Sequence, residues 1–193
     1  MGKKIVIVGG VAGGATAAAR LRRLDESAEI VVIERTGYVS YANCGLPYYV
    51  GGVIEDKEEL TLQSPQSFKS RFNIDVRVSS EVTAIDRAGK CVTVRNLADG
   101  SEYTESYDKL ILSPGARAMV PDTPGVESSR ILKLRTVEDA LEMRRRVEEE
   151  KPERAVVIGG GFIGLEAAEN LMEAGVKVTL LQRSEQVLPP LDW

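Results

Sequence analysis

The chain has 193 residues, 43% hydrophobic and 28% charged, a balance typical of a globular protein large enough to bury a core. Its 25 Lys and Arg against 29 Asp and Glu give a net charge of -4 with the two signs interspersed, so we expect no nucleic-acid partner. The sequence has no histidine, and its two cysteines form no CxxC pair. Histidine-dependent catalytic triads, most zinc sites and a local dithiol are therefore excluded, and we predict no metal site.

The first 34 residues predict a βαβ unit. Residues 5–8 form a β-branched apolar run, residues 13–24 are rich in alanine, and residues 30–33 form a second apolar run. The helical crossover requires the two strands to be parallel. Glycines interrupt the opening apolar stretch and no apolar run is long enough to span a membrane, so we expect a cytoplasmic protein without a membrane partner.

A glycine-rich turn joins the first predicted strand to the helix. Unpaired N–H groups and the positive end of the helix dipole point at whatever occupies such a turn, which suits a pyrophosphate. Glu34 follows Gly14 by twenty positions, where a carboxylate can accept hydrogen bonds from ribose hydroxyls. The outer glycines of G-x-G-x-x-G are present and valine replaces the middle one, so the predicted nucleotide-binding residues are Gly9, Val11, Ala12, Gly13 and Gly14. A glycine-rich turn with a surface glutamate is the alternative.

The segment that follows carries the chemically reactive candidate, Cys44. Pro47 is tolerated only in the first turn of a helix, so Cys44 is expected at or near a helix N-terminus. A helix N-terminus favours the thiolate, which is the reactive form of cysteine.

The middle of the chain predicts a short helix and several strands. Ser64 and Pro65 should open a helix that reaches Phe72. Residues 75–78 and 82–86 read as extended segments, residues 91–95 and 101–106 as a hairpin, and residues 109–112 as a buried strand. Cys91 lies in the hairpin and is interpreted as a passive strand residue.

A change of domain is expected near residues 115–125, where prolines and a glycine cluster. We divide the chain into domains 1–118 and 119–193. Thr136 and Asp139 resemble a capping box that opens a charged helix to Glu150. The order strand, glycine turn, helix, strand then returns at residues 155–158, 162–174 and 176–181.

The second turn contains an intact G-x-G-x-x-G, formed by Gly159, Gly161 and Gly164. Two such turns on one chain imply two dinucleotides, and electron transfer between a nicotinamide and a flavin is the obvious use. Gln182 stands where an acidic residue is expected, eighteen positions after Gly164, and Arg183 follows it. This favours NADPH over NADH, because no carboxylate repels a 2′-phosphate and Arg183 can pair with it. A solvated surface arginine is the alternative.

Four separated blocks resemble the coenzyme A-disulfide reductases and their persulfide-reducing relatives, within the FAD-dependent pyridine nucleotide-disulfide oxidoreductases. The blocks are SYANCGLPYY, GGVAGGATAAARLRRLDE, YDKLILSPGA and GGGFIGLEAAENL. The resemblance implies an α/β fold: an incomplete Rossmann-like FAD-binding domain followed by the start of a second Rossmann-like NAD(P)-binding domain. It also implies a reductase in which NADPH or NADH reduces FAD and FAD reduces Cys44. Cys44 would exchange with a disulfide or persulfide of coenzyme A, which forms a mixed disulfide with it.

The resemblance also implies roles for individual residues. The coenzyme A portion would contact Thr16, Arg20, Arg23, Ser40 and Asn43, although an ordinary charged helix face is an equal alternative for the two arginines. FAD would be lined by Glu34, Arg35, Val82, Ser113 and Gly115. The nicotinamide cofactor would contact Gly159, Gly161, Phe162, Ile163, Gly164, Gln182 and Arg183.

Two further segments of the family, one that completes the FAD domain and one that forms a homodimer, have no counterpart in this sequence. We therefore expect the chain as given to be an incomplete, inactive fragment that binds FAD weakly if at all. A downstream rhodanese-type domain stays open. The rival interpretations are an NADH oxidase or peroxidase that uses a cysteine sulfenic acid, and a noncatalytic nucleotide-binding fragment.

Overall fold

The computed structural model describes residues 2–188, which form two compact units. The first contains the residues up to Tyr41 together with Thr61–Ala116, and the second contains Ala42–Leu60 together with the residues from Arg117 onward. The segment 42–60, assigned from sequence to the first domain, thus groups with the second unit. The division into two binding domains stays a prediction.

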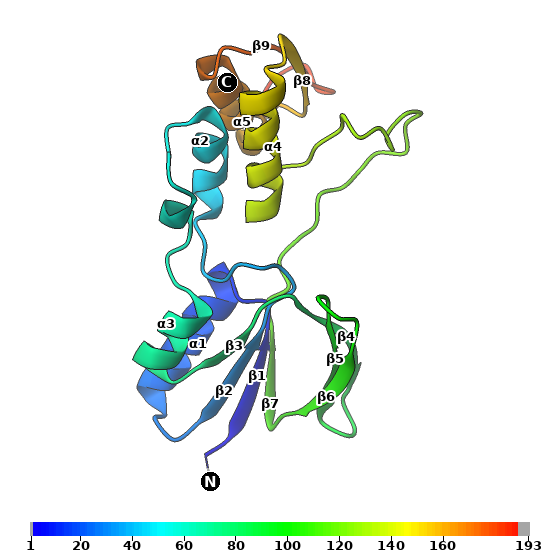
Figure 1. Cartoon of the computed structure of the whole chain (residues 1–193). Helices are drawn as coiled ribbons and strands as arrows, with labels where there is room; N and C mark the ends of the chain where they lie inside the picture. Colours follow the sequence, from blue (N-terminus) through cyan, green and yellow to red (C-terminus); the bar gives the residue numbers. More distant parts are fainter. Residues whose placement is uncertain (1, 189–193) are drawn as a thin grey trace. The chain divides into compact units, whose positions relative to one another are not determined.

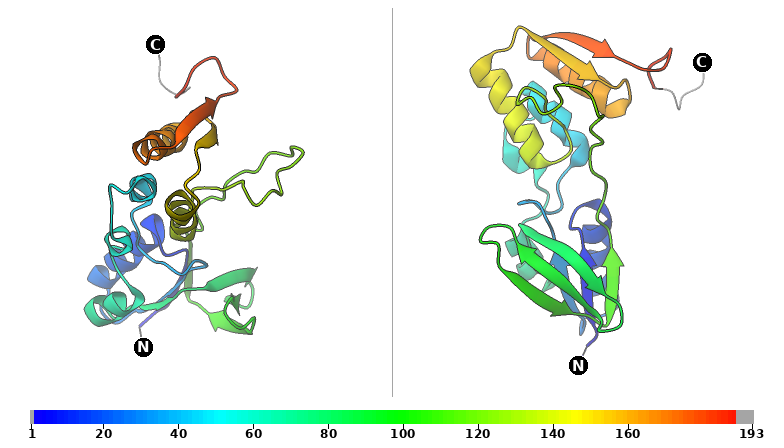
Figure 2. Two further views of the ribbon diagram at one scale, coloured as in Figure 1. Left: turned by 45° about the horizontal axis from the view of Figure 1, so that its top comes forward. Right: turned by 90° about the vertical axis from the view of Figure 1, so that its right-hand side faces the viewer.

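The first unit is built on a parallel four-stranded sheet (Figure 1). Strand β1 (Lys4–Val8) lies between β2 (Glu29–Ile33) and β7 (Lys109–Leu112), and β3 (Asp75–Arg77) lies beyond β2. Helices α1 (Ala12–Leu24) and α3 (Pro65–Phe72) cover one face of this sheet. An antiparallel sheet of β4 (Ser80–Asp86), β5 (Cys91–Asn96) and β6 (Glu102–Ser106) covers the other, as both views in Figure 2 show.

The alternation of side chains along β1 explains why both faces are covered. Ile5 and Ile7 pack in the cluster under α1 and α3, whereas Val6 packs against Val92 and Val94 of the antiparallel sheet. Successive side chains of a strand point to opposite faces, so a strand that is apolar throughout needs a layer on each side. The predicted strand at 109–112 is present but not buried: Leu112 is 56% exposed because β7 lies at the edge of the sheet.

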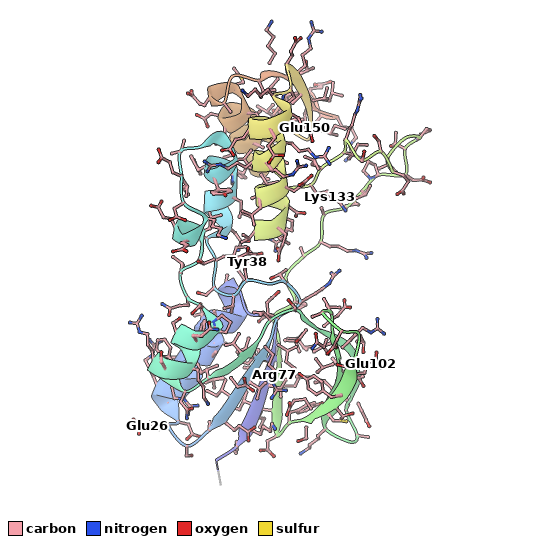
Figure 3. All side chains as sticks on the ribbon, in the orientation of Figure 1. Glu26, Tyr38, Arg77, Glu102, Lys133 and Glu150 are labelled. Carbon is pink, nitrogen blue, oxygen red and sulfur yellow. The ribbon has the colours of Figure 1, made fainter. Side chains whose placement is uncertain are left out.

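A cluster of charges joins the two sheets of the first unit. Glu105 on β6 is buried and forms ion pairs with Lys4, whose Nζ lies 2.6 Å away, and with the Arg77 guanidinium. Arg77 also pairs with Asp75 at 2.8 Å and donates to the Tyr103 hydroxyl at 3.0 Å. Although burial opposes the charge, hydrogen bonds from Lys4 and Arg77 lower the pKa of Glu105. Figure 3 labels Arg77 within this unit.

The second unit holds two short 3-10 helices, three α-helices and two strands within its described part. They are Asn43–Gly45, α2 (Leu46–Gly51), Lys57–Leu60, α4 (Val137–Glu150), β8 (Arg154–Ile158), α5 (Phe162–Glu173) and β9 (Lys177–Leu181). Strands β8 and β9 are parallel. Helix α2 packs against α4 and α5, and a Cβ on Gly51 would lie 2.6 Å from Asn170 Oδ1 of α5. No helix among residues 2–188 is long and apolar enough to cross a membrane.

Candidate functional site

The first glycine turn, between β1 and α1, is held by close backbone contacts. Gly9 has a φ of +93°, and a Cβ on it would lie 2.0 Å from the carbonyl oxygen of Ser113. A Cβ on Gly14 would lie 1.7 Å from the carbonyl oxygen of Gly9. Both positions therefore require glycine. The residue in place of the middle glycine, Val11, is the N-cap of α1 and has a negative φ of -96°, outside the positive-φ region that favours glycine.

The N-terminus of α1 is open to an anion. No side chain caps it and its first turn contains no acidic residue. Helices α3 and α4 differ: α3 begins with a Ser64–Ser67 capping box and α4 with the predicted Thr136–Asp139 box. The N–H groups left free in the first turn of α1 are the donors that a pyrophosphate binds, so the turn fits the phosphates of a dinucleotide.

Glu34 is fixed in place at the end of β2. It is 6% exposed, and its Oε2 accepts from the Gly10 N–H at 2.7 Å. Its Oε1 accepts from the N–H and hydroxyl of Thr36, at 2.8 and 2.9 Å. A carboxylate has about four acceptor positions and three are used here, so one remains for a ribose hydroxyl. The role of Thr36 has no signal in the sequence.

Most other predicted flavin residues of the first unit lie near this turn. A Cβ on Gly13 would lie 3.1 Å from Ser113 Oγ, and Gly115, two residues further on, has a φ of +69°. Arg35 is exposed and pairs with Glu81 at 3.3 Å. Val82 differs from the rest because it packs against the core cluster between the two sheets.

The predicted coenzyme A residues of the first unit occupy two places. Thr16, Arg20 and Arg23 are exposed and share one face of α1, as their spacing of four and three residues requires. Neither arginine side chain has an ion pair or hydrogen bond within residues 2–188, so both charges are available to an anion. Ser40 follows β2, and its N–H donates to the Gly10 carbonyl oxygen at 2.9 Å.

Cys44 is exposed and lies in the single 3-10 turn that leads directly into α2. Pro47 occupies the first turn of α2, which confirms the prediction that the cysteine lies at a helix start. The preceding residue, Asn43, accepts at Oδ1 from the Arg135 guanidinium at 3.1 Å. The segment crosses between units, since Ser40 belongs to the first and Cys44 to the second. Cys91 lies on β5 and is partly exposed.

The second glycine turn repeats the geometry of the first. Gly159 has a φ of +109°, and a Cβ on Gly164 would lie 1.9 Å from the carbonyl oxygen of Gly159. Gly161 is the N-cap of α5, and a Cβ there would meet no atom within 4 Å. No side chain caps α5, its first turn has no acidic residue, and Phe162 and Ile163 at its start are exposed. This turn also fits a pyrophosphate.

Gln182 occupies the position in the second unit that Glu34 occupies in the first. Its Oε1 accepts from the Gly160 N–H at 2.9 Å, and its Nε2 donates to Ser184 Oγ and to the Gln186 carbonyl oxygen. Arg183 is exposed. The two units thus use the same acceptor position, with a charged side chain in one and a neutral side chain in the other.

The family model for pyridine nucleotide-disulphide oxidoreductases matches residues 3–193. The chain belongs to this family. Among curated members it is 41% identical over 190 residues to the coenzyme A disulfide reductase of Staphylococcus haemolyticus, covering 98% of the chain and 42% of the relative. The chain therefore spans about two fifths of the length of this oxidoreductase.

Solved structures of the oxidoreductase family match the fold closely. The reduced Bacillus anthracis CoADR-RHD has a TM-score of 0.97 at 51% identity, over 100% of this chain and 35% of that one. An NAD-dependent persulfide reductase from A. fulgidus has a TM-score of 0.92 at 40% identity, over 98% and 36%. An engineered water-forming NADPH oxidase bound to NADPH, a mutant of the Lactobacillus brevis NADH oxidase, has a TM-score of 0.90 at 33% identity, over 97% and 41%.

Proposed function

We propose that this chain contributes to a reductase in which electrons pass from NADPH through FAD to Cys44, and that Cys44 reduces a disulfide or persulfide of coenzyme A. The observation that carries the proposal is an exposed cysteine at a helix start, in a chain whose helices α1 and α5 each begin without a side-chain cap directly after a glycine turn. The 41% identity to a coenzyme A disulfide reductase supports the substrate class.

The chain's own residues define the thiol steps. The Cys44 thiolate attacks one sulfur of the disulfide, forms a mixed disulfide with one coenzyme A, and releases the other as a thiolate. Two electrons then reduce the mixed disulfide, which returns Cys44 as a thiolate and releases the second coenzyme A as a thiol after protonation. Bound FAD would supply these electrons one pair at a time from the nicotinamide. With a persulfide, attack on the outer sulfur converts Cys44 to a persulfide and releases the coenzyme A thiolate, whereas attack on the inner sulfur forms the mixed disulfide and releases hydrosulfide. Two electrons then return Cys44 to the thiolate, releasing hydrosulfide in the first case and coenzyme A in the second.

The geometry of the glycine turns supports the proposed cofactor sites. FAD would place its pyrophosphate on residues 9–14 and its ribose near Glu34, with Arg35, Val82, Ser113 and Gly115 as further contacts. The diphosphate of coenzyme A would meet Arg20 and Arg23, whose charges have no protein partner within the described residues, together with Thr16, Ser40 and Asn43.

We propose NADPH as the preferred electron donor. In the engineered NADPH oxidase, Asp-Ala-Met is replaced by Ala-Arg-Ser at positions eighteen to twenty residues beyond a substituted glycine. In this chain Gln182, Arg183 and Ser184 stand eighteen to twenty residues beyond Gly164. At these positions both sequences lack a carboxylate and contain an arginine followed by a serine. These side chains can bind a 2′-phosphate. A higher kcat/KM for NADH than for NADPH, measured on the full-length enzyme, would overturn this choice.

The experiment that tests the main proposal compares two cysteine variants of the full-length protein. Cys44→Ser should abolish reduction of coenzyme A disulfide while the protein still binds flavin, whereas Cys91→Ser should leave turnover intact. Stopped-flow mixing with NADPH should still reduce the flavin in Cys44→Ser. Loss of turnover in Cys91→Ser with retention in Cys44→Ser would show that the wrong sulfur has been assigned.

The likeness to the Lactobacillus brevis enzyme keeps an oxidase as the second candidate. In that case Cys44 would pass through a sulfenic acid and reduce oxygen or peroxide. Assays with peroxide, oxygen and coenzyme A disulfide separate the two activities. A noncatalytic role would instead leave Cys44 with the reactivity of an ordinary thiol. Homodimer formation and a cytoplasmic location stay predictions.

A further inference from the structure

Arg135 connects helix α4 to the residue next to the candidate nucleophile. Its backbone N–H donates to Asp139 Oδ2 at 2.9 Å, so the capping box of α4 fixes its position. Its guanidinium donates to Asn43 Oδ1 at 3.1 Å, across 92 residues of sequence. Asn43 precedes Cys44 directly, and both members of the Arg135–Asn43 pair are half-buried. All of these residues belong to the second unit.

This contact decides which way the Asn43 amide faces. A guanidinium carries only donors, so it can be met only by the oxygen of the amide and never by its nitrogen. The Asn43 Nδ2 group, with its two N–H donors, must then point to the opposite side. Among the described residues no acceptor takes a hydrogen bond from Nδ2. Two oriented donors are therefore free one residue before the cysteine.

We propose that Arg135 is a positioning residue: it orients the Asn43 amide so that its N–H donors hold acceptor atoms of the disulfide that reacts with Cys44. The inference rests on the proposed thiol-disulfide chemistry and adds a residue that the sequence did not single out. In this role Arg135 acts on the substrate through Asn43.

Arg144 is the control that distinguishes orientation of the Asn43 amide from mere anchoring of segment 42–60 to α4. It also lies on α4, and its guanidinium donates to the carbonyl oxygens of Tyr49, Ile54 and Glu55, at 3.2, 2.7 and 3.2 Å. It also stacks on the Tyr49 ring at 4.5 Å. Arg144 therefore anchors the same segment, 42–60, without touching Asn43. Arg130, exposed in the connection before α4, serves as a neutral surface control.

The test uses the full-length holoenzyme in a Cys91→Ser background. The first measurement is the rate constant for reaction of Cys44 with a chromogenic aryl disulfide, dithiobisnitrobenzoate; the second is KM and kcat for coenzyme A disulfide. Arg135→Met should lower the rate constant with the aryl disulfide and raise KM for coenzyme A disulfide by roughly tenfold, about the effect of losing one hydrogen bond to the substrate, with a smaller change in kcat. Adding Asn43→Ala to Arg135→Met should cause no further loss, because both changes remove the same oriented donors.

Asn43→Asp gives the sharpest result. Aspartate keeps its bond to Arg135, now as an ion pair, so the melting temperature should hold; but an ionised carboxylate has no N–H donor. The variant should therefore react as slowly as Asn43→Ala. Arg144→Met should lower the melting temperature, but in that variant Asn43→Ala should still slow the reaction of Cys44. Arg130→Met should change neither the melting temperature nor the rate constant.

Wild-type kinetics in Asn43→Asp, or additive losses in the double variant, would overturn the role of Arg135. The role would also be overturned if Arg144→Met slowed the aryl disulfide reaction as much as Arg135→Met does, and if Asn43→Ala then caused no further loss. That result would show that α4 only holds segment 42–60 in place. Failure of the proposed function is separate: the wild-type enzyme would then leave coenzyme A disulfide unreduced, while the aryl disulfide rates still report on Arg135.

Discussion

Two glutamates of one strand, β6, show how burial changes what an ion pair contributes. Glu102 is exposed and pairs with Arg95, which is also exposed. Glu105 is buried and pairs with Lys4 and Arg77, whose side chains are 26% and 31% exposed. A buried carboxylate without its partners would lose its hydration and have no compensating charge, so the pairing of Glu105 should contribute more to stability than the pairing of Glu102.

We expect Glu105→Gln to lower the free energy of unfolding by about 1–3 kcal/mol, because the amide cannot satisfy two cations at once. Glu102→Gln on the same strand is the matched control and should cost less than about 0.5 kcal/mol. Urea unfolding followed by circular dichroism measures both. Equal effects of the two substitutions would contradict the importance given to burial.

The pH dependence of stability should also report on Glu105. Its pKa is lowered in the folded protein from an ordinary value of 4.5. Its contribution is therefore complete above about pH 4.5 and is lost as the pH falls through the folded pKa. The pKa of Lys4 is raised from 10.5 by its hydrogen bonds to Glu105 and Glu29, so the lysine loses its contribution only in strong base.

Unfolding curves of wild-type protein and Glu105→Gln should accordingly converge as the pH falls below about 4.5. The gap between them should stay constant from pH 6 to 8. A gap that does not narrow in acid would show that Glu105 is not the group being protonated.

At the level of elements, the four longer α-helices among the described residues begin in two ways. Helices α3 and α4 begin with complete capping boxes, whereas α1 and α5 begin at glycine turns with no side-chain cap and no acidic residue in the first turn. An uncapped start leaves backbone donors without a protein partner. The two open starts therefore give up local stability at the places where a nucleotide phosphate can supply the missing acceptors.

Gly161→Asp should change stability and binding in opposite directions. The N-cap has extended backbone, and a Cβ there meets nothing within 4 Å, so aspartate fits and should cap α5. We expect the melting temperature to rise slightly and NADPH affinity, followed by fluorescence titration, to fall at least roughly tenfold through charge repulsion. Gly161→Asn caps without charge and should bind NADPH better than Gly161→Asp. Unchanged affinity in both variants would exclude this turn as the nucleotide site.

At the scale of the whole molecule, one supersecondary design occurs twice with one decisive difference. In each unit the strand after the helix ends in a side chain that accepts from an N–H of the glycine turn, Glu34 from Gly10 and Gln182 from Gly160. The shared hydrogen bond is structural. On our proposal, the difference in charge leads the two turns to prefer different nucleotides.

Gln182→Glu should therefore shift cofactor choice and leave the fold intact, since the new carboxylate can still accept from Gly160. It would repel a 2′-phosphate and accept from ribose hydroxyls, so the ratio of kcat/KM for NADPH to that for NADH should fall at least roughly tenfold. Glu34→Gln, at the matching position of the first unit, should leave that ratio unchanged. An unchanged ratio in Gln182→Glu would place the 2′-phosphate elsewhere.

Much of the fold was predictable because its signals are local. Both βαβ units, the glycine turns, the capping box at Thr136 and the helix start beside Cys44 each depend on residues a few positions apart. Periodicity, glycine placement and proline tolerance act over that range. The residues that hold the site were not predictable in this way: Thr36, Arg135 and Arg144 carry no motif of their own.

The sequence by itself determined most of the elements, their order and the two glycine turns, because each follows from short-range backbone preferences. The tertiary structure alone decided which distant side chains meet: the cations around Glu105, the arginine on Asn43, and the grouping of segment 42–60 with the second unit. It also decided that β7 is an exposed edge. These outcomes depend on pairings between residues far apart in the chain, and such pairings leave no mark on the sequence near either partner.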